Sequence, residues 1–220
     1  MRLCWISDHS TVPQTAATVD RELAALRQGA IALVQQGHQV YWVLSPRTLE
    51  AFHDAPALAH ATADALPPTC QYVVPLQPYQ YAGVQLFCVD QQVWQHPDSH
   101  TRLFTFLCLL QRALSCDVFH ALGALSAVYL AIYTARFLGV PAVLSSGWQL
   151  WSAGPSQPFL WHWVVRHVSA AVVSSQVERQ RLLTCSPLEP ARIHMIDAAQ
   201  PEVARTLAVL YARLSGVGRS

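Results

Sequence analysis

The stretch DVFHALGALSAVYLAIYTARFLGVPAVLS, residues 117–145, decides the fold. It opens with an apolar run at 117–122, continues through a helical pattern at 125–138 that Gly139 closes, and ends in a second apolar run at 140–145. Apolar runs without polar alternation on either side of a helix are typical of parallel strands that are buried on both faces. The stretch therefore predicts two parallel strands joined by a crossover helix.

The same alternation extends in both directions along the chain. We expect strands at 2–7, 38–45, 71–76, 84–89, 117–122, 140–145, 170–174 and 192–196. We expect helices through 23–34 and at 100–114, 125–138, 159–168, 176–183 and 201–214, with 47–68 helical in part and 77–83 a turn inside a hairpin. Strands that alternate with helices predict an α/β fold with a doubly wound, mostly parallel, Rossmann-like sheet and helices on both faces. The predicted organisation is one domain at 1–200, followed by a closing C-terminal helix and tail at 201–220.

Composition excludes several classes of protein. Of the 220 residues, 52% are hydrophobic and 12% are charged, which excludes a disordered chain. The net charge of +1 argues against nucleic acid as a partner. All the basic residues other than histidine are arginines, so no lysine is present to serve a phosphate loop or a Schiff base.

Cysteine spacing and hydropathy bear on location and metal binding. The six cysteines form no CxxC pair, and the histidine pairs have no convincing ligand spacing, so we expect reduced thiols and no metal. Charged or histidine side chains interrupt each long apolar stretch before it reaches about 18 residues. We therefore expect a soluble, cytoplasmic chain, with a peripheral position at the inner membrane face as the variant.

In a doubly wound sheet, ligands bind outside the carboxyl ends of the strands. The loops to search are therefore 7–15, 120–125, 145–158 and 174–176. No GxGxxG opens the first helix and no GxSxG is present, so a dinucleotide enzyme and an α/β-hydrolase both lose their main support.

Five short motifs then occur in one order along the chain: GHQV at 37–40, DVFH at 117–120, GVPAV at 139–143, SAAVVSS at 169–175 and PARIHMI at 190–196. Together they resemble the N-terminal domain of the family 4 type glycosyltransferases, which have the GT-B fold. The resemblance implies a nucleotide-sugar donor as co-substrate, no further cofactor, and a sugar or lipid-linked acceptor. In that family a second domain holds the donor.

Three departures from the family shape the functional prediction. The sequence leaves no room for the donor domain between Ile196 and the closing helix, no glycine occurs at 7–15, and Leu122 stands where the family often has a second histidine. We therefore expect the acceptor-binding half of a GT-B glycosyltransferase that needs a donor-binding domain in trans. The alternative is a non-catalytic sugar- or partner-binding module, and a weaker one is an unrelated Rossmann-like enzyme.

The resemblance and the loop positions together nominate the site residues. We predict His120 as the catalytic residue, because a histidine at a strand end could orient an acceptor or balance charge on the transferred sugar. We predict His9, Gly123, Ser146 and Trp148 as substrate-binding residues. The structural alternatives are a hydrogen-bonded histidine at position 120 and a solvated one at position 9.

Tryptophans concentrate between Trp148 and Trp163, where four of the seven occur. Indole rings stack on sugars and also favour the membrane interface. The segment could thus serve as an acceptor platform, a peripheral membrane contact or a contact for a partner domain, or it could pack the helix at 159–168 onto the sheet.

Overall fold

A mixed β-sheet forms the centre of the molecule in this computed structural model, which describes residues 1–9, 16–50, 52, 58–61, 66–145, 158–196 and 202–216. Its strands within those residues are β1 (Arg2–Asp8), β2 (Gln39–Leu44), β3 (Ala59–His60), β4 (Leu76–Tyr81), β5 (Val84–Val89), β6 (Val118–Gly123), β7 (Ala142–Ser145), β8 (Ala170–Val173) and β9 (Ile193–Met195). They are ordered β3-β4-β5-β2-β1-β6-β7-β8-β9. The strands from β5 through β9 in this order pair in parallel, whereas β4 is antiparallel to both β3 and β5.

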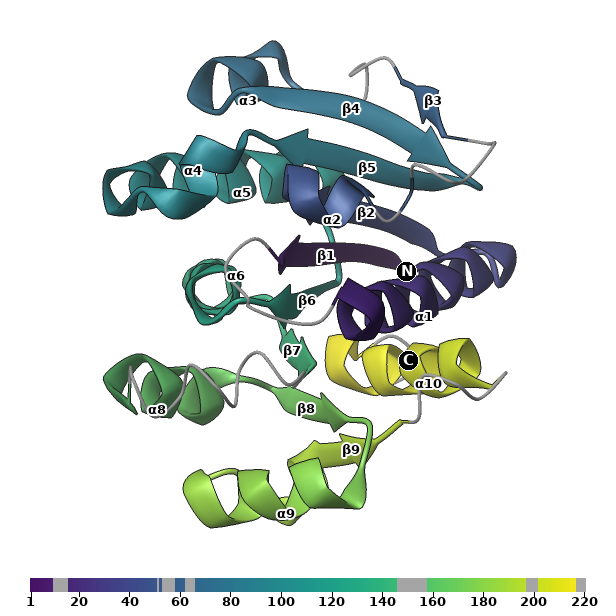
Figure 1. Cartoon of the computed structure of the whole chain (residues 1–220), viewed down its shortest axis with the longest axis vertical. Coiled ribbons are helices and arrows are strands. Elements are labelled where there is room, and N and C mark those ends of the chain that lie inside the picture. Colours follow the sequence, from purple (N-terminus) through teal and green to yellow (C-terminus); the bar gives the residue numbers. More distant parts are fainter. Residues whose placement is uncertain are drawn as a thin grey trace.

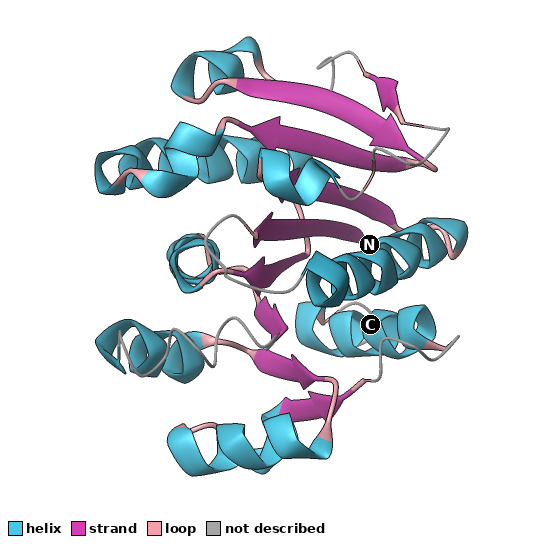
Figure 2. Ribbon diagram, viewed as in Figure 1, coloured by secondary structure: helices cyan, strands magenta, loops and turns pink. Residues whose placement is uncertain are grey.

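Helices cover both faces of this sheet (Figures 1 and 2). They are α1 (Ala16–Gln35), α2 (Pro46–Glu50), α3 (Pro68–Val73), α4 (Gln91–Gln95), α5 (His100–Leu114), α6 (Leu125–Phe137), α8 (Pro158–His167), α9 (Gln176–Cys185) and α10 (Val203–Ser215). Two single turns of 3₁₀ helix, η1 (Pro97–Ser99) and η2 (Pro190–Arg192), complete the described elements. The predicted α/β, doubly wound, mostly parallel fold is confirmed.

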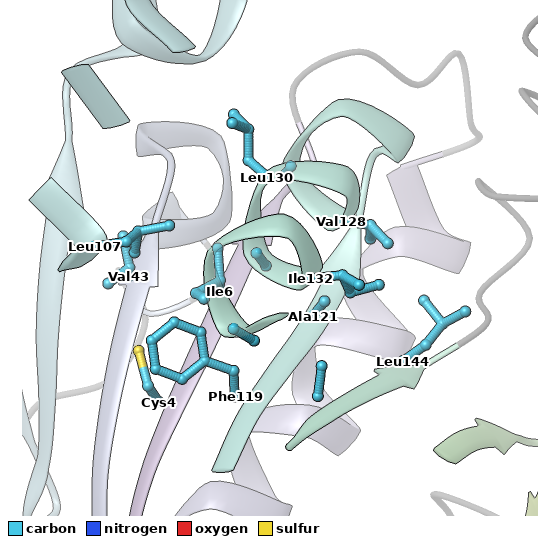
Figure 3. Packing of buried hydrophobic residues seen from close by; sticks show 14 of the residues in the cluster. Cys4, Ile6, Val43, Leu107, Phe119, Ala121, Val128, Leu130, Ile132 and Leu144 are labelled. Atoms are coloured by element: carbon cyan, nitrogen blue, oxygen red, sulfur yellow. The ribbon is translucent and has the colours of Figure 1, made fainter. Parts of the chain in front are cut away.

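The sheet separates two apolar cores, because successive residues of a strand point to opposite faces. Cys4 and Ile6 of β1 pack with α5, α6 and α8 on one face, where Phe119 and Leu107 join them (Figure 3). Leu3 and Trp5 pack on the other face, beneath α1 and α10. Figure 1 shows α5, α6 and α8 on one side of the sheet and α1 and α10 on the other. Both faces of β1 are therefore buried, as its unbroken apolar sequence requires.

The deciding stretch at 117–145 folds as expected into β6, α6 and β7. The region before β5 differs from the prediction. Of residues 71–76, expected to be a strand, 71–73 lie in α3, and residues 77–83, expected to be a turn, lie mostly in β4. The cause is the tight turn at Ala82 and Gly83, whose φ angles of 47° and 85° fit a two-residue hairpin loop. That loop sets Tyr81 opposite Val84, so the strand register places β4 at Leu76–Tyr81.

Candidate functional site

The order of the strands reverses at β1, which lies between β2 on one side and β6 on the other. The chain moves outward from β1 in one direction to reach β2 and in the opposite direction to reach β6. In open α/β sheets the ligand crevice lies at this switch point, outside the carboxyl ends of the strands. The carboxyl ends of β1, β2, β6 and β7 meet here. Asp8, Gly123 and Ser145 are the last residues of β1, β6 and β7, and Ser45 directly follows β2.

Gly123 makes the closest backbone contact at the switch point. Its φ of +87° is a conformation that other residues rarely adopt. A Cβ at this position would lie 2.2 Å from the backbone oxygen of Asp8, and the same oxygen accepts a 2.8 Å hydrogen bond from the Ala124 amide. The glycine lets β6 turn directly into α6 while it touches β1. The predicted Gly123 thus lies at the switch point, and its substrate-binding role stays a prediction.

His9 follows β1 and is buried, with only 4% of its surface exposed. Its Nδ1 lies 3.0 Å from Oγ1 of Thr48, which in turn lies 3.1 Å from Oγ of Ser45. Burial lowers the pKa of His9 to about 4, so the ring is neutral near pH 7. The solvated alternative is wrong: Thr48 of α2 presents its hydroxyl group to the buried ring, and the sequence did not show that pairing.

His120 lies on β6 beneath α10 and is also buried. Its Nδ1 lies 2.6 Å from Oη of Tyr211, and its Nε2 lies 2.7 Å from Oγ of Ser145. A neutral imidazole donates through one nitrogen and accepts through the other, and both hydroxyls can take either part. Burial lowers the pKa of His120 to about 3 and raises that of Tyr211. With both ring nitrogens occupied, His120 could contact a substrate only if Ser145 turned away, and its catalytic role stays a prediction.

Ser145 is the residue through which His120 reaches the ligand edge. It ends β7, it is partly exposed, and the imidazole holds its hydroxyl in place. Sequence reasoning named Ser146 instead of Ser145. The sequence places the end of a strand only to within about one residue, and a shift of one residue changes which side chain points toward the ligand edge. Ser146 and Trp148 themselves lie outside the described residues.

Two further residues, the hydrogen-bond partners of the histidines, were also missed: Thr48 beside His9 and Tyr211 beside His120. Thr48 stands three residues after Ser45 at the start of a helix, a spacing typical of hydroxyl groups around a helix N-terminus. Tyr211 lies on the closing helix, α10. It lies 91 positions from His120, and no local pattern pairs the two.

Removing the Tyr211 hydroxyl tests the buried hydrogen-bond network of Tyr211, His120 and Ser145. In Tyr211→Phe the buried Nδ1 of His120 loses its hydrogen-bond partner, so we expect the free energy of unfolding to fall by about 1–3 kcal/mol. Urea denaturation monitored by circular dichroism measures the change. Tyr72→Phe is the matched control, because Tyr72 is 85% exposed and should change stability by less than about 0.5 kcal/mol. Equal effects of the two substitutions would contradict the buried network.

The described part of the tryptophan-rich segment divides between core and surface. Trp161 is buried against the sheet, and Trp163 is partly buried in contact with rings of α6. Trp148 and Trp151 lie outside the described residues. Across the ranges that the structure describes, no group of three or more His, Cys, Asp or Glu side chains is placed to hold a metal ion.

A cavity of about 440 Å³ lies away from the switch point, beside the first residues of β8 and β9. Arg192, His194 and the last turns of α10 line it. It stands at the amino ends of the strands, the opposite end from the ligand edge of this fold class. We therefore place the candidate site at the switch point and not in this cavity.

Comparison with known proteins identifies the fold. No protein-family model and no curated protein matches the sequence. Among solved structures, the chain resembles UDP-GlcNAc 2-epimerase from Neisseria meningitidis bound to UDP-GlcNAc, with a TM-score of 0.54 and 9% identity over 100% of this chain and 52% of that chain. For UDP-GlcNAc 2-epimerase from Methanocaldococcus jannaschii the TM-score is 0.56 and the sequence identity is 12%, over 89% of this chain and 45% of that chain. For UDP-N-acetylglucosamine 2-epimerase from Rickettsia bellii the TM-score is 0.54 and the sequence identity is 12%, over 96% of this chain and 48% of that chain.

The chain thus spans about half the length of the structures it resembles. At such low identity the likeness shows the fold alone, and that fold is a Rossmann-like half domain of the GT-B type. The expected GT-B half is confirmed at this level. The finer assignment to the family 4 type glycosyltransferases stays a prediction.

Proposed function

We propose that this chain is the acceptor-binding half of a glycosyltransferase-like nucleotide-sugar enzyme. The observation that carries the proposal is the switch point, where Gly123 touches the backbone of Asp8 and His120 fixes the hydroxyl of Ser145. A held hydroxyl beside a close backbone turn is suited to hydrogen bonding with a sugar, because its rotamer is set before the ligand arrives. The donor-binding domain would face this edge, from a separate chain or from a further part of the same one.

The similar structures guide the choice of donor. Their names describe enzymes that act on UDP-GlcNAc, and one was solved with that compound bound. A UDP-linked sugar is therefore the donor class to test first. In the proposed arrangement the second domain holds the nucleotide, and the present chain contributes Ser145 and the predicted Gly123, Ser146 and Trp148 on the acceptor side.

Calorimetric titration and thermal shift separate the two halves of this proposal. A ligand that binds only the folded state at about a hundred times its Kd stabilises it by about 2.7 kcal/mol. We expect mono- and oligosaccharide acceptors to raise the melting temperature and UDP-GlcNAc, UDP-glucose and UDP to leave it unchanged. Saturable nucleotide binding by this chain alone would overturn the acceptor-half assignment.

A substitution at the strand end tests the site itself. Ser145→Ala should weaken saccharide binding about fivefold, the effect of losing one hydrogen bond. Ser115→Ala is the control, because Ser115 is exposed and lies on the amino side of β6. If saccharides bind equally well to both variants, the switch point is not the acceptor site.

One observation favours the second candidate, a sugar-binding module without catalysis. The predicted catalytic histidine is neutral near pH 7, buried, and hydrogen-bonded through both ring nitrogens. A general base must reach the proton it removes, directly or through one water. Saccharide binding that persists while no donor domain yields transfer activity would favour this alternative.

A further inference from the structure

Aromatic side chains form a continuous band across the outer surface of α5, α6 and α8. The rings of Phe104 on α5 and Tyr133 on α6 lie 5.5 Å apart between centroids, and those of Tyr129 on α6 and Trp163 on α8 lie 4.9 Å apart. The ring of His167 stacks on that of Trp163 at 4.2 Å. We call this band the aromatic face; its members are Phe104, Tyr129, Tyr133, Phe137, Trp163 and His167.

The face is open on its outer side. Phe137 is 67% exposed and Tyr133 is 42% exposed, and Phe159, one turn before Trp163 on α8, is 78% exposed. The apolar residues that hold these helices to the sheet lie beneath and are buried. Single exposed apolar residues are ordinary on a protein surface, but connected rings from three helices form a patch of the kind that contacts another phase or molecule.

The charged residues on the three helices of the aromatic face have one sign. The helices α5, α6 and α8 contain Arg102, Arg112, Arg136 and Arg166 and no aspartate or glutamate. Arg136 and Arg166 are exposed. The carboxylates nearest in sequence precede and follow α5, at Asp98 in η1 and at Asp117, and Asp117 accepts a hydrogen bond from the Arg2 amide. Aromatic rings edged by cations and free of acids on their own helices complement an anionic surface.

We propose that the aromatic face docks this chain onto the surface of an anionic phospholipid bilayer. Tryptophan and tyrosine combine an apolar ring with a polar tip and favour the level of the lipid headgroups. The planar guanidinium of arginine matches a phosphate group through paired hydrogen bonds. Across the ranges that the structure describes, no helix has the length and hydropathy to span a bilayer. In the proposed contact the rings lie at headgroup depth and the arginines lie on the lipid phosphates.

This surface differs from the tryptophan-rich segment that the sequence singled out. Trp163 belongs to both, but the remaining rings come from α5, from α6 and from the end of α8. The docking inference stands independently of the proposed function. It also relates the membrane surface to the proposed acceptor site. The helix α6 begins beside Gly123 at the switch point and carries three of the rings of the face. An acceptor held in the membrane would lie on the same side of the molecule as this helix.

Vesicle flotation of the full 220-residue chain tests the proposal. We expect the chain to float with vesicles of phosphatidylcholine and phosphatidylglycerol in equal parts and not with phosphatidylcholine alone. Each arginine near an anionic surface should strengthen binding about fivefold, so Arg136→Gln with Arg166→Gln should weaken it about 25-fold. Phe137→Ser with Phe159→Ser should weaken it by about tenfold or more, because both rings leave water on docking.

Matched controls lie on the other side of the sheet. Arg205 and Val209 on α10 are exposed, and Arg205→Gln with Val209→Ser should leave flotation unchanged. Melting temperatures equal to that of the wild type show that each variant folds. The proposal is overturned if the wild type does not bind the anionic vesicles or if the α6 and α8 variants bind as the wild type does. It is also overturned if the wild type is a dimer by light scattering, does not float, and becomes a monomer in Phe137→Ser with Phe159→Ser.

Discussion

Gly123→Ala is expected to lower the free energy of unfolding by about 2–5 kcal/mol, since it combines backbone strain of about 1–2 kcal/mol with overpacking of about 1–3 kcal/mol. The strain follows from the φ of +87°, and the overpacking from the added methyl group 2.2 Å from the backbone oxygen of Asp8. Backbone atoms of a central strand cannot swing aside as a flexible side chain can. Because whole domains are stable by only about 5–15 kcal/mol, this loss is a large part of the total.

Gly37→Ala provides the matched control for Gly123→Ala. Gly37 has nearly the same φ, +84°, but an added Cβ would meet no atom within 4 Å. It should therefore cost only the backbone strain, about 1–2 kcal/mol. Urea denaturation of both variants isolates the clash as the difference between them. If the two substitutions cost the same, β1 and β6 do not approach as closely as the structure shows.

Acid is expected to destabilise the fold by about 4 kcal/mol between about pH 7.5 and about pH 5, through His9 and His120. Burial lowers their pKa values in the folded state to about 4 and about 3, against 6.5 for an unburied histidine. The unfolded chain therefore binds protons first as the pH falls. The stability from keeping these rings neutral is complete above about pH 6.5 and is lost progressively below it, by about 1.4 kcal/mol per pH unit for each ring.

Urea unfolding at a series of pH values measures this slope. His38, His100 and His194 are less buried, and their pKa values shift in the same direction, so they add to it. His9→Gln and His120→Gln should each reduce the slope of the unfolding free energy against pH by about 1.4 kcal/mol per pH unit, the contribution of one proton. Tyr211→Phe should lower stability at every pH and leave the slope unchanged, because burial is the cause of the shift at His120. Stability that does not vary across this range would show that neither ring is held neutral.

The local part of the candidate site was predictable from the sequence. Gly123 follows an apolar run and precedes a helical pattern, and that context placed it in the loop after a strand. His9 was likewise placed directly after a strand, where the structure has it, whereas His120 lies inside β6 and not at its carboxyl end as predicted. The environment of each was not predictable, because the hydroxyls of Thr48 and Tyr211 come from other elements, 39 and 91 positions away.

In the region before β5, the local sequence pattern did not settle even the type of secondary structure. A short apolar pair at Val73 and Val74 fits a strand as well as the end of a helix, and length alone does not separate them. The hairpin turn at Ala82 and Gly83 decides, because it fixes which residues of β4 can pair with β5.

By itself the sequence determined the alternation of strands and helices and the mostly parallel sheet, and it predicted the carboxyl edge of that sheet as the ligand site. These follow from the period of the apolar residues and from the glycines, which act over a few positions. The tertiary structure alone decided that His120 is buried between Tyr211 and Ser145, and that rings from α5, α6 and α8 meet in one aromatic face. Burial and hydrogen-bond partners depend on which elements pack together, and that packing joins residues that no local pattern relates.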